Sequence, residues 1–238
     1  MRRFGLLLAA ALALVPAGVA SARVKVDVMV VGKSAVLAVP KRVAVPERTV
    51  RVAGRRCAVP SRTPLSALVA TKLPYKLTDY GACSRRVRDA GSLYVRSVSG
   101  ERAQGTDGWV YKVGRRAGSG GAADPAGPFG TGRRLRSGAD VLWFWCVKDA
   151  GDSCQRTLEV RPGGPVTPGA PLRVVVRGYD DNGDGVPVEG ATVRLGDQLA
   201  LSAADGSATL VAPATGAETL TADKDGLVPS FPVKVRVS

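Results

Sequence analysis

The sequence predicts a mainly β protein in two parts: an α+β first domain with a single helix, and a small β-sandwich after it. Apolar residues alternate with polar ones along much of the chain, as they do in half-buried strands. The clearest stretch with apolar residues at helical spacing follows Thr63. A segment rich in proline and glycine, residues 161–171, separates the two parts. We therefore expect a first domain over 23–160, a linker over 161–171 and a sandwich over 172–238.

The first 22 residues have the pattern of an export signal. Two arginines precede an apolar run over 4–15, and Ala20-Ser21-Ala22 matches the small residues that precede a cleavage site. The apolar run is shorter than a membrane-spanning helix requires. We expect an exported chain that begins at Arg23, has no transmembrane anchor, and works outside the cell or at the cell wall.

The first domain is expected to begin with short strands. Val24, Val26, Val28 and Val30 alternate with other residues, and residues 35–39 return beside them. Prolines at positions 40 and 46 limit these strands to short or edge positions, because proline has no amide proton to donate to a sheet. Residues 49–59 then form a hairpin that turns at Ala53-Gly54.

The helix is predicted over residues 63–72. Thr63 is a good N-cap, Pro64 suits the first helical position, and apolar residues at 65, 68 and 69 share one face. Further strands follow near 92–98, 109–113, 141–147 and 155–160. A hairpin, a helix and then more strands is the order of a β-grasp-like layout, in which one helix crosses a mixed sheet.

Residues 114–138 are expected to form a long irregular loop, because glycine recurs along them and Asp124-Pro125 lies at their centre. A loop of this length inside a domain is usually functional or mobile. Beyond residue 171 the pattern is entirely that of strands, with turns at Asp205-Gly206 and Asp225-Gly226. Several short strands at this spacing predict a small β-sandwich.

Residue types limit the chemistry. The chain contains no histidine, so neither a Ser-His-Asp nor a Cys-His catalytic set can form, and an enzyme is the least favoured class. An even number of cysteines in an exported chain favours disulfides over thiols or metal sites. The four are Cys57, Cys83, Cys146 and Cys154. Three pairings are open, and chain order favours Cys57–Cys83 and Cys146–Cys154.

Charge is unevenly distributed. Residues 23–160 contain 25 Lys and Arg against 11 Asp and Glu, a net charge of +14, whereas residues 161–238 contain 7 against 9, a net charge of −2. Arginine pairs at 55–56, 85–86, 115–116 and 133–134 suit an anionic cell-wall polymer or lipid headgroups. The alternative is a solvated surface with no partner. Aromatic residues are not interleaved as in nucleic-acid-binding proteins, so no nucleic acid is expected.

Two segments carry a resemblance to known families. The first domain resembles the transcobalamin-like C-terminal domain, through Gly108-Trp109-Val110-Tyr111 and the stretch Leu135–Trp143. This resemblance implies a β-grasp-like fold and allows for a corrinoid-like ligand. Gly114 and Ala139 depart from that family's usual pattern. The second domain resembles carboxypeptidase-regulatory-like or bacterial Ig-like domains through residues 188–193, 204–210 and 221–229, which implies a spacer or adhesion module.

Candidate site residues are aromatic rings and one acidic loop. Tryptophan and tyrosine offer stacking surface with a polar tip, which suits a sugar or a planar ligand, although core packing is the alternative. The candidate ligand-binding residues are Trp109, Tyr111, Phe129, Trp143 and Trp145. The spacing of Asp180, Asn182 and Asp184 resembles a calcium loop, with a polar turn as the alternative.

These observations favour a secreted, non-enzymatic binding or adhesion protein. The alternatives are a carrier of a small planar ligand such as a corrinoid, or a purely structural spacer of the cell envelope. No cofactor is expected beyond calcium at the acidic loop.

Overall fold

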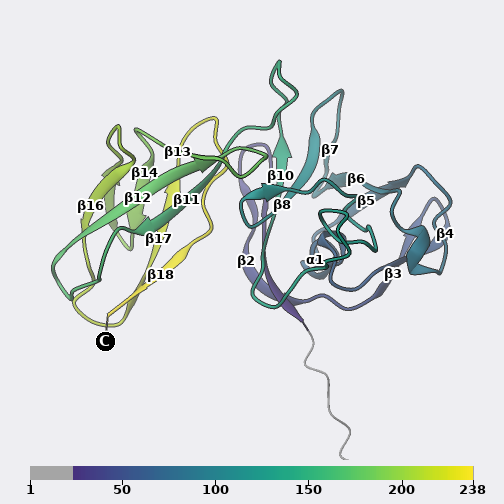
Figure 1. Cartoon of the computed structure of the whole chain (residues 1–238), viewed down its shortest axis with the longest axis horizontal. Helices are drawn as coiled ribbons and strands as arrows, with labels where there is room; N and C mark the ends of the chain where they lie inside the picture. The colour runs from purple at the N-terminus through teal and green to yellow at the C-terminus, as the bar shows by residue number, and fades with distance from the viewer. Residues whose placement is uncertain (1–23, 238) are drawn as a thin grey trace, which may run out of the picture.

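The computed structural model describes residues 24–237. The expected export signal over residues 1–22 lies outside them. The described chain forms two units, which we call the N-terminal unit (24–156) and the C-terminal unit (157–237). They lie side by side along the long axis of the molecule (Figure 1). Within residues 24–237 no helix is both long and apolar enough to cross a membrane.

The N-terminal unit is built on a mixed five-stranded sheet in the order β2-β1-β10-β8-β9. β1 runs parallel to β10, and the remaining pairs are antiparallel. Its strands are β1 (Lys25–Val31), β2 (Val36–Ala44), β8 (Gly108–Val113), β9 (Arg116–Ala117) and β10 (Asp140–Cys146). β2 contains Pro40 and lies at the sheet edge, as expected.

Smaller elements complete this unit. A hairpin of β3 (Arg48–Val52) and β4 (Arg55–Val59) turns at Ala53-Gly54, where both residues have positive φ. Another sheet consists of β5 (Tyr75–Asp79), β6 (Leu93–Val98) and β7 (Glu101–Arg102), with a short 3-10 helix η1 (Val87–Asp89) between β5 and β6.

Helix α1 (Pro64–Ala70) begins where the sequence predicts, and its cap explains why. The Thr63 hydroxyl accepts from the Ser66 amide, while the Ser66 hydroxyl accepts from the Thr63 amide, so two free donors of the first turn are satisfied. The helix packs on the sheet through Trp143, whose indole nitrogen donates to the Pro64 carbonyl at 3.1 Å. One helix across a mixed sheet confirms the α+β architecture expected for this part.

The C-terminal unit is a β-sandwich of two four-stranded antiparallel sheets around one apolar core, which confirms the fold expected there. One sheet contains β11 (Thr157–Pro162), β12 (Pro171–Tyr179), β13 (Gly185–Pro187) and β16 (Ser207–Val211). The other contains β14 (Thr192–Leu195), β15 (Gln198–Leu201), β17 (Ala217–Asp223) and β18 (Val233–Arg236).

The segment expected to be an interdomain linker, residues 161–171, does not join the two units. It connects β11 to β12, which pair from Thr157–Tyr179 to Pro162–Val174. The apolar side chains of β11, Leu158 and Val160, lie in the core of the sandwich. The boundary therefore falls before Thr157, and the prolines and glycines of residues 161–171 serve a connection within one sheet.

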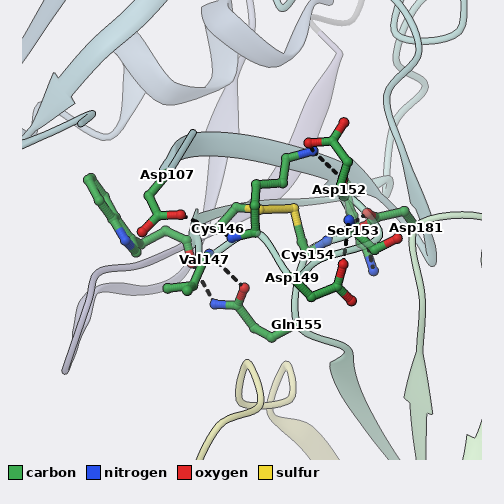
Figure 2. The surroundings of a disulfide bond; sticks show 12 residues. Asp107, Cys146, Val147, Asp149, Asp152, Ser153, Cys154, Gln155 and Asp181 are labelled. Carbon is green, nitrogen blue, oxygen red and sulfur yellow. Dashed lines mark hydrogen bonds and ion pairs between the residues drawn. A yellow bond between two sulfur atoms is a disulfide. The ribbon is translucent and has the colours of Figure 1, made fainter. Parts of the chain in front are cut away.

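Both disulfides have the pairing that chain order favours. Cys57 bonds to Cys83 and Cys146 to Cys154, with Cα atoms 5.3 and 5.2 Å apart. The second bond joins the end of β10 to the segment that enters β11 (Figure 2). Around it, the Gln155 amide group donates to the Trp145 carbonyl and accepts from the Val147 amide. The connection between the two units is thus a closed, hydrogen-bonded loop.

The two faces of β10 have different partners. Val141, Trp143 and Trp145 face the core beneath α1, as the alternation predicts. Leu142, Phe144 and Cys146 lie on the opposite face, in an apolar cluster with Met29 and Val31 of β1. The same cluster includes Val228 and Phe231 of the C-terminal unit. An apolar cluster therefore continues from one unit into the other.

Candidate functional site

A cleft lies between β6, β8 and the glycine-rich loop of the N-terminal unit. Its volume is about 460 Å³, and we call it the aromatic cleft. Its walls include Tyr80, Tyr94, Trp109, Tyr111, Trp143 and most of the loop residues 117–122, and Asp181 of the C-terminal unit also lines it. Ligand sites in proteins are commonly cavities of about 300–1,000 Å³ lined by aromatic groups with a few polar ones.

Three of the five predicted aromatic residues form the floor of this cleft. Trp109, Tyr111 and Trp143 are each less than 10% exposed, and they belong to the core beneath α1. The ring centroids of Tyr111 and Trp143 are 5.4 Å apart on neighbouring strands. These rings shape the floor of the cleft but expose little surface to a ligand. Their burial agrees with core packing, the alternative to ligand binding.

The other two predicted residues lie outside the cleft. Trp145 is buried, packs edge-on against Trp109 with ring centroids 5.9 Å apart, and is covered by the Lys33 ammonium 4.2 Å from its centroid. Phe129 is half-buried, and the Arg116 guanidinium lies 5.3 Å from its centroid. Neither ring is among the residues that line the cleft.

The rings that open to solvent are ones the sequence analysis did not select. Tyr80 is 73% exposed, and its ring centroid lies 6.0 Å from that of the half-buried Tyr94. Tyr94 occupies an outward-facing position of β6, between the buried residues Leu93 and Val95. That alternation was a usable signal for Tyr94, whereas Tyr80 directly follows a strand and has no periodic pattern.

The glycine-rich loop forms one wall and is held in place by specific hydrogen bonds. The Tyr111 hydroxyl lies 2.7 Å from the Gly120 carbonyl oxygen and 3.1 Å from that of Pro128. The Leu65 amide at the start of α1 donates to the Ala122 carbonyl. Burial raises the pKa of Tyr111, with the nearby Asp124 carboxylate as a smaller cause, so this phenol stays neutral and keeps its proton. The loop is irregular beyond β9, which the expected range 114–138 had included, and it is anchored at both the sheet and the helix.

The acidic loop of residues 180–184 is folded on itself. Asp180 Oδ1 accepts from the amides of Asn182 and Asp184, and Asp180 Oδ2 lies 3.5 Å from Arg156 Nη2. Within the described part of the chain, no three acidic, cysteine or histidine side chains converge as a metal site. The two hydrogen bonds to Asp180 Oδ1 are typical of a polar turn, and calcium binding by Asp180, Asn182 and Asp184 stays a prediction.

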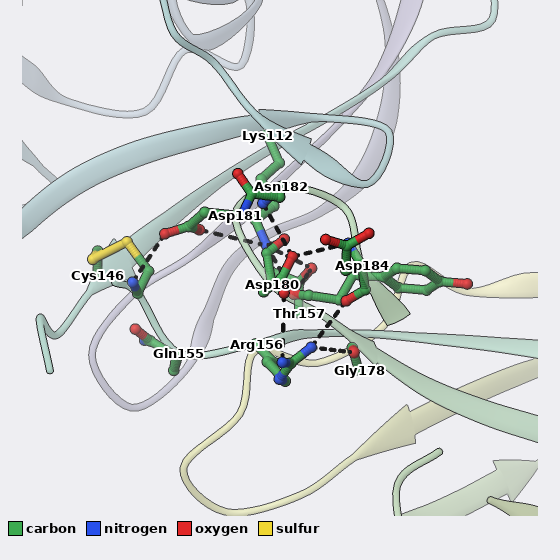
Figure 3. Close-up of polar contacts among 12 residues, drawn as sticks. Lys112, Cys146, Gln155, Arg156, Thr157, Gly178, Asp180, Asp181, Asn182 and Asp184 are labelled. Carbon is green, nitrogen blue, oxygen red and sulfur yellow. Dashed lines mark hydrogen bonds and ion pairs between the residues drawn. A yellow bond between two sulfur atoms is a disulfide. The ribbon is translucent and has the colours of Figure 1, made fainter. Parts of the chain in front are cut away.

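A lysine of the N-terminal unit supplies a positive charge to this loop (Figure 3). The Lys112 side chain is fully buried, and its ammonium donates to the carbonyls of Tyr179 and Asp180 at 2.9 and 2.8 Å. Thr157 Oγ1 lies at 3.3 Å and Asp181 Oδ1 at 3.7 Å. Burial lowers the pKa of Lys112 to about 8, against the opposing pull of the Asp181 and Asp180 carboxylates. No sequence pattern indicates this contact, because the partners lie in different units.

No family model matches the chain, and neither curated proteins nor solved structures give a match. The two family resemblances remain predictions that rest on the motifs quoted above.

Proposed function

We propose that the protein is exported and acts as a non-enzymatic binding protein, with the aromatic cleft as its ligand site. The observation that carries this proposal is the pair Tyr80 and Tyr94 at the rim of a preformed aromatic cavity. Two disulfides suit an oxidising compartment outside the cytosol. The absence of histidine from the chain removes the commonest general base, which supports binding rather than catalysis.

The size and lining of the cleft narrow the class of ligand. A volume of about 460 Å³ suits a molecule of one or two rings, such as part of an oligosaccharide or a small planar compound. A whole corrinoid is larger than this cavity and would bury only one edge in it. Tyrosine side chains provide both a stacking face and a hydrogen-bonding group, which sugars use together. We therefore favour a carbohydrate of the cell envelope over a corrinoid.

The proposal is tested by titration with chito-oligosaccharide and, separately, with cobalamin. All three tryptophans lie in the N-terminal unit, and Trp109 and Trp143 lie beneath the cleft, so tryptophan emission should change on binding. Tyr80→Ala should weaken binding about tenfold, since loss of one stacked ring removes on the order of 1 kcal/mol or more. The free energy of unfolding of the Tyr80→Ala variant should be unchanged, because the Tyr80 side chain is largely exposed.

Val39→Ala is the matched control, because Val39 is 72% exposed and lies outside the cleft. Binding of cobalamin alone would favour the carrier function instead. A second assay measures the amount of protein that is pulled down on isolated cell walls. If neither probe binds and Tyr80→Ala leaves that amount unchanged, the cleft is not the binding site. The structural spacer would then be the better interpretation.

A further inference from the structure

A cluster of exposed arginines lies at the end of the molecule away from the C-terminal unit, where Figure 1 shows β3 and β4. We call it the arginine surface. It consists of Arg51, Arg55, Arg56, Arg85, Arg86 and Arg88, all of them exposed. The first three belong to the β3–β4 hairpin, and the others belong to the segment that contains η1. Residues far apart in the sequence are thus brought to the same end of the molecule, with Arg51 and Arg56 on one face of the hairpin and Arg55 on the other.

The fold fixes these two segments against each other. The disulfide Cys57–Cys83 joins β4 to the second segment, and the Ala58 amide donates to the Ser84 carbonyl at 2.7 Å. The surface is therefore preformed, so a partner would not have to order it on binding.

Repulsion between two of these arginines lowers the stability of the folded protein. Arg51 and Arg56 stand directly opposite on β3 and β4, and like charges in that position are destabilising. Within residues 24–237, Arg51, Arg56, Arg85 and Arg86 form no ion pair. Their positive charge is left for an external anion.

Of the nearby carboxylates, Asp79 and Asp89 are engaged within the N-terminal unit, and Glu47 adds one negative charge beside Arg85, Arg86 and Arg88. Asp79 accepts from Arg55, from the Ser92 hydroxyl and from two backbone amides, and its side chain is only 1% exposed. Asp89 accepts from the Ser84 hydroxyl at 2.6 Å and lies 3.7 Å from Arg88. Both carboxylates are engaged in holding the segment in shape.

The shape of the surface indicates a long partner. Glu47, Arg85, Arg86 and Arg88 surround a shallow, open depression of about 610 Å³. Such a surface would not enclose a small ligand, but an extended chain can cross it. Among the described residues, none of the large apolar side chains that are exposed belongs to the arginine surface. A lipid bilayer is the other occupant to consider, and it is one outcome of the test below.

We propose that the arginine surface binds an extended polyanion that carries a phosphate or a carboxylate on each repeat. Guanidinium groups bind either anion through two parallel hydrogen bonds, and several such contacts along a flexible chain add together. The arginine surface shares no residue with the aromatic cleft, so this proposal stands or falls independently of the proposed function.

The test is a titration with a short linear polyphosphate and, in a second arm, with polygalacturonate, each at about 50 and about 200 mM sodium chloride. Arg56→Gln with Arg86→Gln should weaken binding about five- to tenfold at the lower salt. The control is Arg133→Gln with Arg136→Gln, which removes the same charge from exposed arginines of the same unit outside the arginine surface. The control should weaken binding less than about twofold.

The two arms distinguish the source of the anion, since binding of one polymer alone identifies phosphate or carboxylate as the preferred group. Equal weakening in both double variants would overturn the proposal, because binding would then depend on overall charge. So would the absence of binding to either polymer at low salt. Binding to phosphatidylglycerol vesicles but to neither polymer would assign the surface to a membrane and would also overturn it.

Discussion

Gly118 lies where the glycine-rich loop crosses the ring of Tyr111. A Cβ at this position would stand 2.1 Å from the ring atom Cζ, a distance that no packing tolerates. Gly118→Ala must therefore displace either the loop or the ring, and we expect it to lower the free energy of unfolding by about 1–3 kcal/mol. Urea unfolding measured by tryptophan emission checks this.

Gly91→Ala is the matched substitution for comparison. Gly91 lines the same cleft, but a Cβ there would meet nothing within 4 Å. The alanine should leave stability unchanged or raise it by a few tenths of a kcal/mol, as expected when backbone freedom of the unfolded chain is reduced. Equal destabilisation by the two variants would show that the close approach of Gly118 to Tyr111 is not what requires a glycine.

Lys112 links stability to pH at the contact between the two units. Its pKa is about 8 in the folded protein and 10.5 ordinarily, because burial disfavours the charged form. Between these values the unfolded chain holds a proton that the folded chain has released. The free energy of unfolding should therefore rise as pH increases from about 8 to about 10.5, by no more than about 3 kcal/mol from this residue.

The comparison with Lys112→Met isolates this effect. Methionine removes the charged donor from the carbonyls of Tyr179 and Asp180, which keep only the Thr157 hydroxyl and the Gly183 amide, so the variant should be less stable by about 1–3 kcal/mol at neutral pH. The difference between the two proteins should then widen above pH 8, as followed by urea unfolding. A difference that stays constant with pH would show that the lysine keeps its ordinary pKa.

At the scale of elements, Asp79 holds the connection from β5 to β6. Its oxygens accept from the amides of Gly81 and Cys83 and from the hydroxyl of Ser92, and they pair with Arg55. These contacts, the Ser92 hydrogen bond foremost, lower the pKa of Asp79. A lowered pKa means that the stabilisation is complete above the ordinary value of 3.8 and is lost as pH falls through the folded value.

Asp79→Asn should therefore destabilise the N-terminal unit by about 2 kcal/mol at pH 7, and the two proteins should converge in strong acid. Tryptophan emission during urea unfolding between about pH 2 and 7 is the measurement. A gap that persists at the acid end would mean that the charge of Asp79 is not what stabilises the connection.

The elements themselves were largely predictable, because their signals are local. The capping residues Thr63 and Pro64 located α1, alternation located β1, and the aromatic segments that follow glycine-containing turns located β8 and β10. The prediction of an interdomain linker over residues 161–171 was wrong for a physical reason. Proline and glycine end regular structure in a connection within one sheet just as they do between two domains. The partner of β11 depends on burial of Leu158 and Val160, which composition does not reveal.

The candidate site was only partly predictable. Trp109, Tyr111 and Trp143 were selected because they are large and aromatic, and those properties placed them in the core. The open part of the cleft depends on Tyr80 and Tyr94 and on the position of the loop at 117–122, which tertiary packing determines. Lys112 shows the same limit, since an alternating strand gives no sign that one polar position will be covered by a second unit.

At the scale of the whole molecule, the two units are packed as one body. Met29, Leu142 and Phe144 from the main sheet belong to one apolar cluster with Val228, which lies in the connection between β17 and β18. Polar contacts surround this cluster: Arg115 pairs with Glu159 at 2.8 Å, and the Ala117 amide donates to the Asp181 carbonyl. An interface that is both apolar and hydrogen-bonded couples the unfolding of one unit to that of the other.

Coincident unfolding of the two units is therefore expected, and the distribution of tryptophan makes it measurable. Tryptophan emission reports only on the N-terminal unit, whereas far-ultraviolet circular dichroism reports on the strands of both. The two signals should give the same urea transition in the natural protein. Val228→Asp places an unpaired charge in the shared apolar cluster, so the two signals should then give two separate transitions. The control is Val211→Asp, at a position of the sandwich that is 47% exposed, and it should leave a single transition. Separate transitions in the natural protein would show instead that the contact between the units contributes little, and that each folds on its own core.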